Sequence, residues 1–162
     1  MINIDIIKSK IYDSSTIKSK VDIWKFENRK IVFTNGCFDI LHRGHVEYLS
    51  KSKDFGDILI VGLNTDVSVK KLKGENRPIN DEESRAFLLS SLFFVDAVVY
   101  FEEDTPLKLI KEVQPDVLVK GGDYILNNIV GYDFVKSYGG NIVTVDMIDG
   151  YSTTNIIEKA DI

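Results

Sequence analysis

The chain has 162 residues, of which 44% are hydrophobic, so it can bury one core and leaves little room for a second domain. Its formal net charge of −5 argues against non-specific nucleic-acid binding, which requires an excess of Lys and Arg. The single cysteine, Cys37, excludes an internal disulfide, and no apolar run approaches the roughly 20 residues that span a bilayer. These features predict a cytoplasmic protein that is not inserted in a membrane.

Strands and helices are expected to alternate along most of the chain. Residues 1–29 are predicted to form an N-terminal helical extension, in which Asp13 can cap a short helix that runs toward Trp24. Short apolar runs predict strands, and amphipathic stretches predict helices. The strands are expected at 30–34, 57–63, 97–101, 116–119 and 141–145, and the helices at 44–53, 80–92, from 105 onward and at 152–159. Apolar strands that are each followed by a helix indicate a parallel sheet covered on both faces. We therefore predict a doubly wound, Rossmann-like α/β domain over residues 30–162, with five parallel strands and helices on both faces.

The two histidines of the chain, His42 and His45, stand three residues apart just after the first predicted strand. In the first turn of a helix, positions i and i+3 point the same way, so both imidazoles would converge beside the free N–H groups of the helix start. Gly44 lacks a side chain and would let a phosphate approach the backbone. Because doubly wound sheets bind ligands at the carboxyl ends of their strands, this pattern predicts an anion site there.

Two other interpretations of the histidines stay open. They could form a metal pair with Cys37 or Asp39 as a third ligand, or they could be structural. The chain has neither G-x-G-x-x-G after a strand nor G-x-x-x-x-G-K-[ST], so a nucleotide would be bound by another device. The glycine between the histidines and the strand–turn–helix context favour the phosphate site.

The segment TNGCFDILHRGH, residues 34–45, resembles the HxGH nucleotidyltransferase superfamily, which has the cytidylyltransferase-like fold. LKGENRP at 72–78, VKGGDY at 119–124 and DGYSTTNII at 149–157 extend the likeness, which covers about residue 27 to the end. Together these motifs are similar to the D-glycero-β-D-manno-heptose 1-phosphate adenylyltransferase domain, found alone or fused to a sugar kinase. The length of the chain leads us to expect the stand-alone form.

The resemblance implies a reaction in which an oxygen of a sugar 1-phosphate attacks the α-phosphorus of ATP and pyrophosphate leaves. It also implies Mg²⁺ bound with ATP, small-molecule substrates and a homodimer, with no nucleic-acid or membrane partner. One alternative is a cytidylyltransferase that acts on glycerol 3-phosphate or another small phosphorylated alcohol. A second is a nucleotide-binding regulator that has lost catalysis.

The resemblance and the local patterns together assign candidate site residues. The expected catalytic residues are His42, His45, Lys73 and Lys71. The residues expected to contact the nucleotide and its phosphates are Thr34, Asn35, Gly36, Cys37, Phe38, Gly44, Arg85, Lys120, Gly121, Gly122, Asp123, Ser152, Thr153 and Thr154. The residues expected at the second substrate are Asp39, Asp66 and Arg77. We assign no direct protein ligand to a metal.

Each of the outer motifs also has a simpler interpretation. Residues 152–154 can bind the β- and γ-phosphates at a helix start, or they can only cap that helix. Gly121 and Gly122 would let a base or ribose lie against bare backbone, or they form a tight turn. The lysines at 70–73, in a loop after the second strand, reach the transferred phosphate or form a solvated surface. Arg85 contacts phosphate or is a structural arginine.

Overall fold

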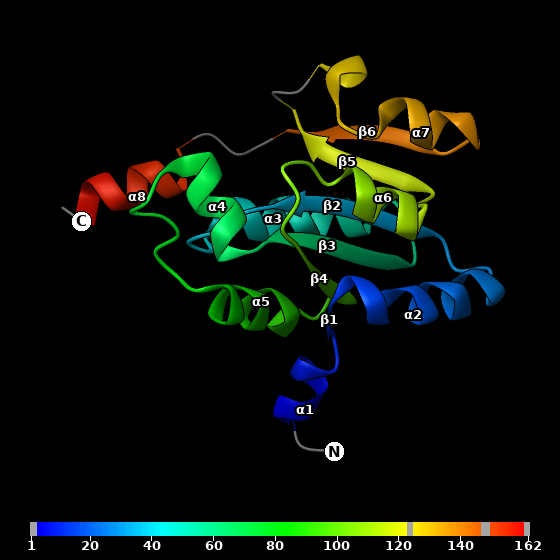
Figure 1. The fold of residues 1–162 in the computed structure, drawn as a ribbon, viewed down its shortest axis with the longest axis horizontal. Helices are drawn as coiled ribbons and strands as arrows, with labels where there is room; N and C mark the ends of the chain where they lie inside the picture. Colours follow the sequence, from blue (N-terminus) through cyan, green and yellow to red (C-terminus); the bar gives the residue numbers. More distant parts are fainter. Residues whose placement is uncertain (1–2, 123–124, 147–149, 161–162) are drawn as a thin grey trace.

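The computed structural model describes residues 3–122, 125–146 and 150–160. Its strands form one sheet in the order β1-β4-β3-β2-β5-β6, and every neighbouring pair is parallel (Figure 1). The strands are β1 (Ile11–Tyr12), β2 (Ile31–Gly36), β3 (Ile58–Asn64), β4 (Ala97–Phe101), β5 (Val117–Gly121) and β6 (Asn141–Val145). The doubly wound parallel fold is confirmed.

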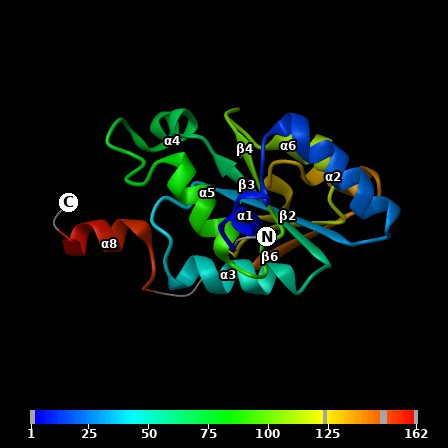
Figure 2. The ribbon, with the colours of Figure 1, turned by 90° about the horizontal axis from the view of Figure 1, so that it is seen from below.

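Helices cover both faces of the sheet (Figure 2). They are α1 (Asn3–Lys8), α2 (Ser14–Phe26), α3 (Arg43–Lys53), α4 (Asp66–Lys73), α5 (Glu82–Ser91), α6 (Leu107–Val113), α7 (Tyr132–Ser137) and α8 (Thr153–Ala160), with a 3₁₀ turn at Leu126–Asn128. Helices α2, α6 and α7 pack on one face, and α3 and α5 pack on the other. Successive strand residues point to opposite faces of the sheet. Phe33 therefore lies in the core under α2, α6 and α7, and Val32 lies in the core under α3 and α5.

The predicted number of strands was too small by one. Strand β1 adds to the edge of the sheet, where Ile11 pairs with Val98 and Tyr12 with Val99. Two residues are too few to show an alternating pattern, so sequence periodicity could not reveal this strand. The described part of residues 1–29 therefore contributes to the sheet as well as to helices.

Helix α2 begins where its capping residue predicts. The side chain of Asp13 accepts hydrogen bonds from the backbone N–H groups of Ser15 and Thr16, both at 2.9 Å. The Thr16 hydroxyl in turn accepts from the Asp13 N–H, which completes a capping box. Ile17, Val21 and Trp24 on the inner side of this helix lie in the same core as the central strands.

Helix α4 was not expected, because the lysines at 70–73 were predicted to lie in a loop after the second strand. Thr65 caps it by accepting from the Ser68 N–H, and Gly74, with φ of 97°, ends it. The lysines at 70–73 consequently lie on the last turns of a helix, where cations interact favourably with the helix dipole.

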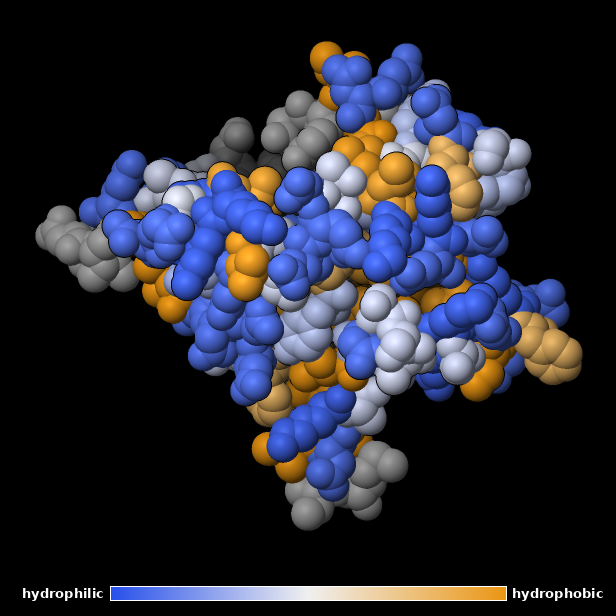
Figure 3. All heavy atoms as spheres, viewed as in Figure 1, coloured by the Kyte–Doolittle hydropathy of each residue, from blue (hydrophilic) through white to orange (hydrophobic). Residues whose placement is uncertain are grey.

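Hydrophilic residues dominate the face of the molecule seen in Figure 3, and apolar residues are scattered among them. Ile4 and Ile6 on α1 are 45% and 43% exposed. Across the residues with described positions, we find no helix with the length and apolar character that a membrane span needs.

The packing of α2 predicts that residues 13–26 unfold together with the rest of the domain. Ile17→Ala removes a fully buried side chain and should lower the free energy of unfolding by about 2–5 kcal/mol. Ile23→Ala, on the same helix but 50% exposed, should change it by less than about 0.5 kcal/mol. Urea unfolding followed by Trp24 fluorescence and by circular dichroism should give coincident transitions. An earlier fluorescence transition would show that α2 is a separate unit.

Candidate active site

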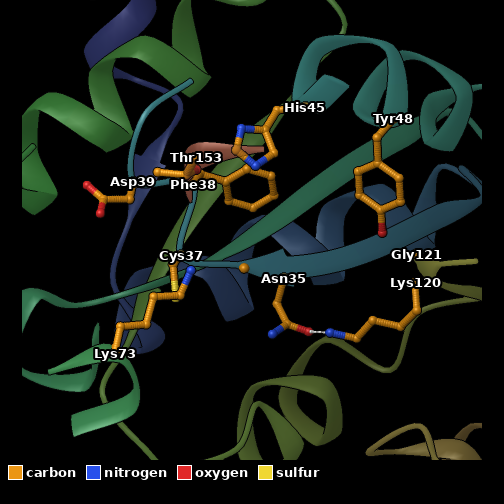
Figure 4. A pocket seen from close by; sticks show the side chains of 11 residues that line it. Asn35, Cys37, Phe38, Asp39, His45, Tyr48, Lys73, Lys120, Gly121 and Thr153 are labelled. Atoms are coloured by element: carbon orange, nitrogen blue, oxygen red, sulfur yellow. Dashed lines mark hydrogen bonds between the residues drawn. The ribbon is translucent and has the colours of Figure 1, made fainter. Parts of the chain in front are cut away.

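A cavity of about 250 Å³ opens at the carboxyl ends of β2 and β5. From β2 the sheet grows through β3 and β4 on one side and through β5 and β6 on the other, so the cavity lies at the topological switch point. The side chains around it are shown in Figure 4. Its lining residues are Asn35, Gly36, Cys37, Phe38, Asp39, His45, Tyr48, Lys73, Lys120, Gly121 and Thr153.

The two imidazoles stack on each other rather than pointing side by side at one atom. Their ring centroids are 3.7 Å apart and their planes differ by 19°. His42 is the N-cap of α3, and its Nδ1 accepts a 3.4 Å hydrogen bond from the backbone N–H of His45. This acceptor role requires the neutral His42 tautomer that carries its proton on Nε2. Only His45 of the two belongs to the cavity lining.

Both histidines are held in the neutral form. Burial, together with the nearby His42 and Lys73, lowers the pKa of His45 to about 4. Burial also lowers the pKa of His42. The Nδ1 atom of His45 is buried and has no hydrogen-bond partner among the residues with described positions. Because Nδ1 is inaccessible, only another part of the neutral ring can meet an incoming polar ligand in the cavity.

Phe38 fixes the orientation of the His45 ring. The Phe38 ring meets it edge-on, with a centroid distance of 5.1 Å and an interplanar angle of 65°. Phe38 itself has φ of 44°, an uncommon left-handed conformation for a bulky residue, and is only 7% exposed. A Cβ atom on Gly36 would lie 3.0 Å from the Phe38 ring, so glycine leaves the room that this arrangement needs.

Gly44 is crowded by protein groups. A Cβ atom at this position would lie 3.1 Å from Nδ1 of His42 and 3.1 Å from Cβ of Tyr151. The glycine thus lets the His42 ring and Tyr151 pack against the start of α3. Its expected contact with a phosphate stays a prediction.

Two lysines from different elements stand on opposite sides of the cavity in Figure 4. Lys73, at the end of α4, is exposed and lies beside Cys37. Lys120, at the end of β5, is 8% exposed, and its ammonium donates a hydrogen bond to Oδ1 of Asn35 on β2. Lys71 is exposed and does not belong to the described cavity lining.

Cys37 is poorly suited to nucleophilic chemistry. Burial raises the pKa of its thiol, and the nearby Lys73 and Arg85 only partly oppose this effect. Nor does the thiol join the histidines in a metal site, because no three His, Cys, Asp or Glu side chains gather suitably anywhere in the described structure. The metal-pair interpretation of the histidines is therefore unsupported.

Arg85 lies under the cavity, fully inside the protein. It is 1% exposed, and every nitrogen of its guanidinium donates a hydrogen bond. The acceptors are the carbonyls of Cys37 at 2.6 Å, Asn64 at 2.8 Å and Asn80 at 3.0 Å, and Oδ1 of Asp66 at 2.7 Å. Neither Arg85 nor Asp66 belongs to the described cavity lining. Their ion pair connects α5 to the start of α4, and their expected contacts with the substrates stay predictions.

Asp39 borders the cavity, but its carboxylate is already occupied. It pairs with Arg77 and accepts from the backbone N–H groups of Ile79 at 2.7 Å and Asn80 at 3.2 Å. Asp39 is 1% exposed. This arrangement anchors the segment after α4 to the segment after β2.

The predicted C-terminal phosphate residues take different positions. Oγ of Ser152 accepts from the Asn155 N–H at 3.0 Å, which caps α8, and Thr153 lines the cavity. Thr154 is exposed.

Thr34, expected to contact the nucleotide, is buried on β2, and its hydroxyl lies 2.7 Å from that of Tyr48.

The glycines at the end of β5 and just after it also differ in their surroundings. Gly121 lines the cavity, whereas a Cβ atom on Gly122 would lie 2.6 Å from Oδ1 of Asp146. Gly122 therefore permits a close approach between protein segments. The predicted contact of Asp123 falls outside the described residues.

Sequence reasoning missed Tyr48 as a cavity residue. It follows His45 by three positions on α3, so helical spacing places both on the same side. That spacing was the available signal, but an aromatic residue in an amphipathic helix is equally typical of a core position.

Comparisons with known proteins agree with this geometry. The family model described as cytidylyltransferase-like matches residues 33–159. The Bifunctional protein HldE of Geobacter metallireducens is 54% identical over 151 residues, which are 93% of this chain and 31% of that protein. The protein of the same name from Campylobacter curvus is 58% identical over 131 residues, covering 81% of this chain and 27% of that one. The chain thus spans about a third of the length of these relatives.

Comparison with solved structures supports the same fold. A lipopolysaccharide core biosynthesis protein from Thermoplasma volcanium is 34% identical, with a TM-score of 0.61, and the match covers 76% of this chain and 99% of that one. A pantothenate synthetase from Thermus thermophilus, at 16% identity and a TM-score of 0.63, shares the fold. With a family model matched over most of its length, the chain belongs to the cytidylyltransferase-like family of nucleotidyltransferases.

Proposed function

We propose that this protein transfers AMP from ATP to D-glycero-β-D-manno-heptose 1-phosphate, giving ADP-heptose and pyrophosphate. The observation that carries the proposal is a cavity at the switch point of the sheet in which neutral His45 faces lysines from two sides. The adenine nucleotide and the heptose acceptor are supported by the motifs at residues 72–78, 119–124 and 149–157. The lipopolysaccharide role in the name of the Thermoplasma relative agrees with this acceptor.

The reaction requires the enzyme to hold two anionic reactants in line. An oxygen of the sugar phosphate bonds to the α-phosphorus as the bond from that phosphorus to the bridging β-oxygen breaks. The electron pair of the broken bond leaves with pyrophosphate, so no protein side chain has to act as a nucleophile. Catalysis then depends on positioning and on groups that stabilise the negative charge of the transition state.

His45 is suited to that role because it is neutral and rigidly held. A neutral imidazole can donate a hydrogen bond to a phosphoryl oxygen through the one ring nitrogen that carries a proton. The edge-on contact with Phe38 and the stack with His42 hold the ring in place before the substrate arrives. A donor that is already oriented needs no reorganisation during the reaction.

The two lysines supply charge from opposite walls. Lys73 would attract the phosphate groups from the side of α4, and Lys120 from the side of β5. Thr153, at the start of α8, adds its hydroxyl and the free N–H groups of a helix N-terminus. The remaining candidates would act indirectly. Lys71 would act through the position of α4, and Arg85 and the Asp39–Arg77 pair through the segments that they anchor.

Magnesium fits this site as a partner of ATP and not as a metal held by carboxylates. Asp39 is the one acidic side chain in the described lining, and its oxygens are engaged by Arg77 and by backbone N–H groups. Mg²⁺ commonly binds through substrate phosphates and water, and when bound it would offset the charge of the departing pyrophosphate.

A cytidylyltransferase that acts on glycerol 3-phosphate or another small phosphorylated alcohol is the second candidate, favoured by the description of the matching family.

We also propose a cytoplasmic homodimer. Phe93, which is 90% exposed between α5 and β4, is a side chain suited to such an interface.

Pyrophosphate release should identify the substrates. With Mg²⁺ and heptose 1-phosphate, ATP should give rapid release, whereas CTP with glycerol 3-phosphate should give almost none. ATP without an acceptor is the control for hydrolysis. Turnover of CTP alone would overturn the proposed nucleotide, and nucleotide binding without any release would indicate a regulator.

His45→Ala should slow the chemical step. Loss of one oriented donor should lower kcat about 10²- to 10³-fold, while the Kd for ATP should change far less. Steady-state kinetics and calorimetric titration measure the two effects, and the urea midpoint checks that the variant remains folded. An equal loss in kcat and in affinity would contradict a role specific to the transition state.

The two histidines should titrate differently before and after ATP binds. In the free protein, the NMR signal of His45 should titrate near pH 4 and that of His42 below 6.5, with His42→Gln as the assignment control. ATP should raise both pKa values, because nearby negative charge favours the imidazolium. Values near 6.5 in free protein, or no response to ATP, would contradict the site.

The same depressed pKa has a consequence for stability. Because the folded value for His45 lies below the ordinary value of 6.5, the unfolded chain binds more protons between these limits. The contribution of neutral His45 is thus present above about pH 6.5 and is lost as the pH falls toward 4.

A further inference from the structure

Helix α8 contributes to the cavity although most of it lies away from the sheet. Figures 1 and 2 both show it projecting from the body of the molecule. Its first residue, Thr153, nevertheless lines the cavity. A side chain can contribute to phosphate binding only if its position is fixed, so some contact must hold this helix start against the rest of the site.

Tyr151 makes that contact with the histidine turn. Its Cβ lies 3.1 Å from the position that a Cβ atom on Gly44 would occupy, so the tyrosine packs on the bare glycine. The guanidinium carbon of Arg43 lies 5.6 Å from the centre of the Tyr151 ring, which is within cation–π range. Nε of Arg43 also donates a 2.6 Å hydrogen bond to Glu47, one helical turn along α3.

The backbone before Tyr151 is shaped for this approach. Gly150 has φ of 84°, a conformation that glycine adopts without strain, and among the described residues no atom lies within 4 Å of a Cβ at that position. The chain can therefore turn at Gly150 and bring Tyr151 onto Gly44. Tyr151 in turn lies two residues before Thr153.

We propose that Arg43, Gly44 and Tyr151 form a clasp that fastens the N-terminus of α8 to the histidine turn, and that Arg43 and Tyr151 are positioning residues for Thr153. This inference rests on the proposed function of the cavity, since Thr153 matters only if phosphates bind there. In the clasp, Tyr151 packs against the bare backbone of Gly44. Arg43, the variable residue of the HxGH pattern, connects the histidine turn to the start of α8.

The clasp predicts coupled kinetic effects. Tyr151→Ala should lower kcat/KM for ATP roughly ten- to hundredfold, as expected for a displaced binding group, whereas Tyr151→Phe keeps the ring and should retain most of the activity. Thr153→Val should be harmful in the wild type but should cost little more in the Tyr151→Ala background. Arg43→Ala combined with Tyr151→Ala should be less harmful than the product of the single effects. Glu158→Gln, exposed on α8, is the control.

Hydrogen exchange tests the clasp without any substrate. In Tyr151→Ala and in Arg43→Ala, the amides of residues 154–157 should exchange at least about fivefold faster than in the wild type, while those of β2 should be unchanged. This result stands even if the wild-type protein releases no pyrophosphate from ATP, so failure of the clasp and failure of the proposed function are distinguishable. Unchanged exchange, or strictly multiplicative effects of the paired substitutions, would overturn the proposal.

Discussion

A buried guanidinium joins four segments of the chain beneath the cavity. Arg85 on α5 donates to the backbone at Cys37, Asn64 and Asn80 and to the carboxylate of Asp66. Removing such a charge from water is costly unless each donor finds an acceptor, and here each nitrogen does. The carbonyls that it binds belong to the loop after β2, the end of β3 and the segment before α5, so their relative positions are fixed together.

The Asp39–Arg77 pair supplements this constraint from the other side of the loop. Asp39 is nearly inaccessible and holds the backbone at Ile79 and Asn80. Phe38, between Cys37 and Asp39, is thereby kept in a left-handed conformation that places its ring against His45. Residues whose polar groups are engaged by other protein groups thus determine the orientation of one that is proposed to contact the ligand, as a preorganised site requires.

The electrostatics of the cavity differ from those of the chain as a whole. The formal net charge is −5, yet the described lining brings together Lys73, Lys120 and a neutral His45, and its one acidic side chain is neutralised by Arg77. A local excess of positive charge in a partly enclosed cavity favours a small phosphorylated ligand.

The sequence alone determined the features that depend on neighbouring residues. Apolar runs followed by amphipathic stretches predicted the doubly wound sheet, and the histidine pair beside a strand located the cavity. Only the tertiary structure decided that Arg85 pairs with Asp66 and Asp39 with Arg77, that the imidazoles stack, and that Ile11 and Tyr12 add a strand. The backbone partners of Arg85 and Asp39, most of them 21 to 48 positions away, carry no side-chain signature, because every residue has a carbonyl and nearly every one an N–H.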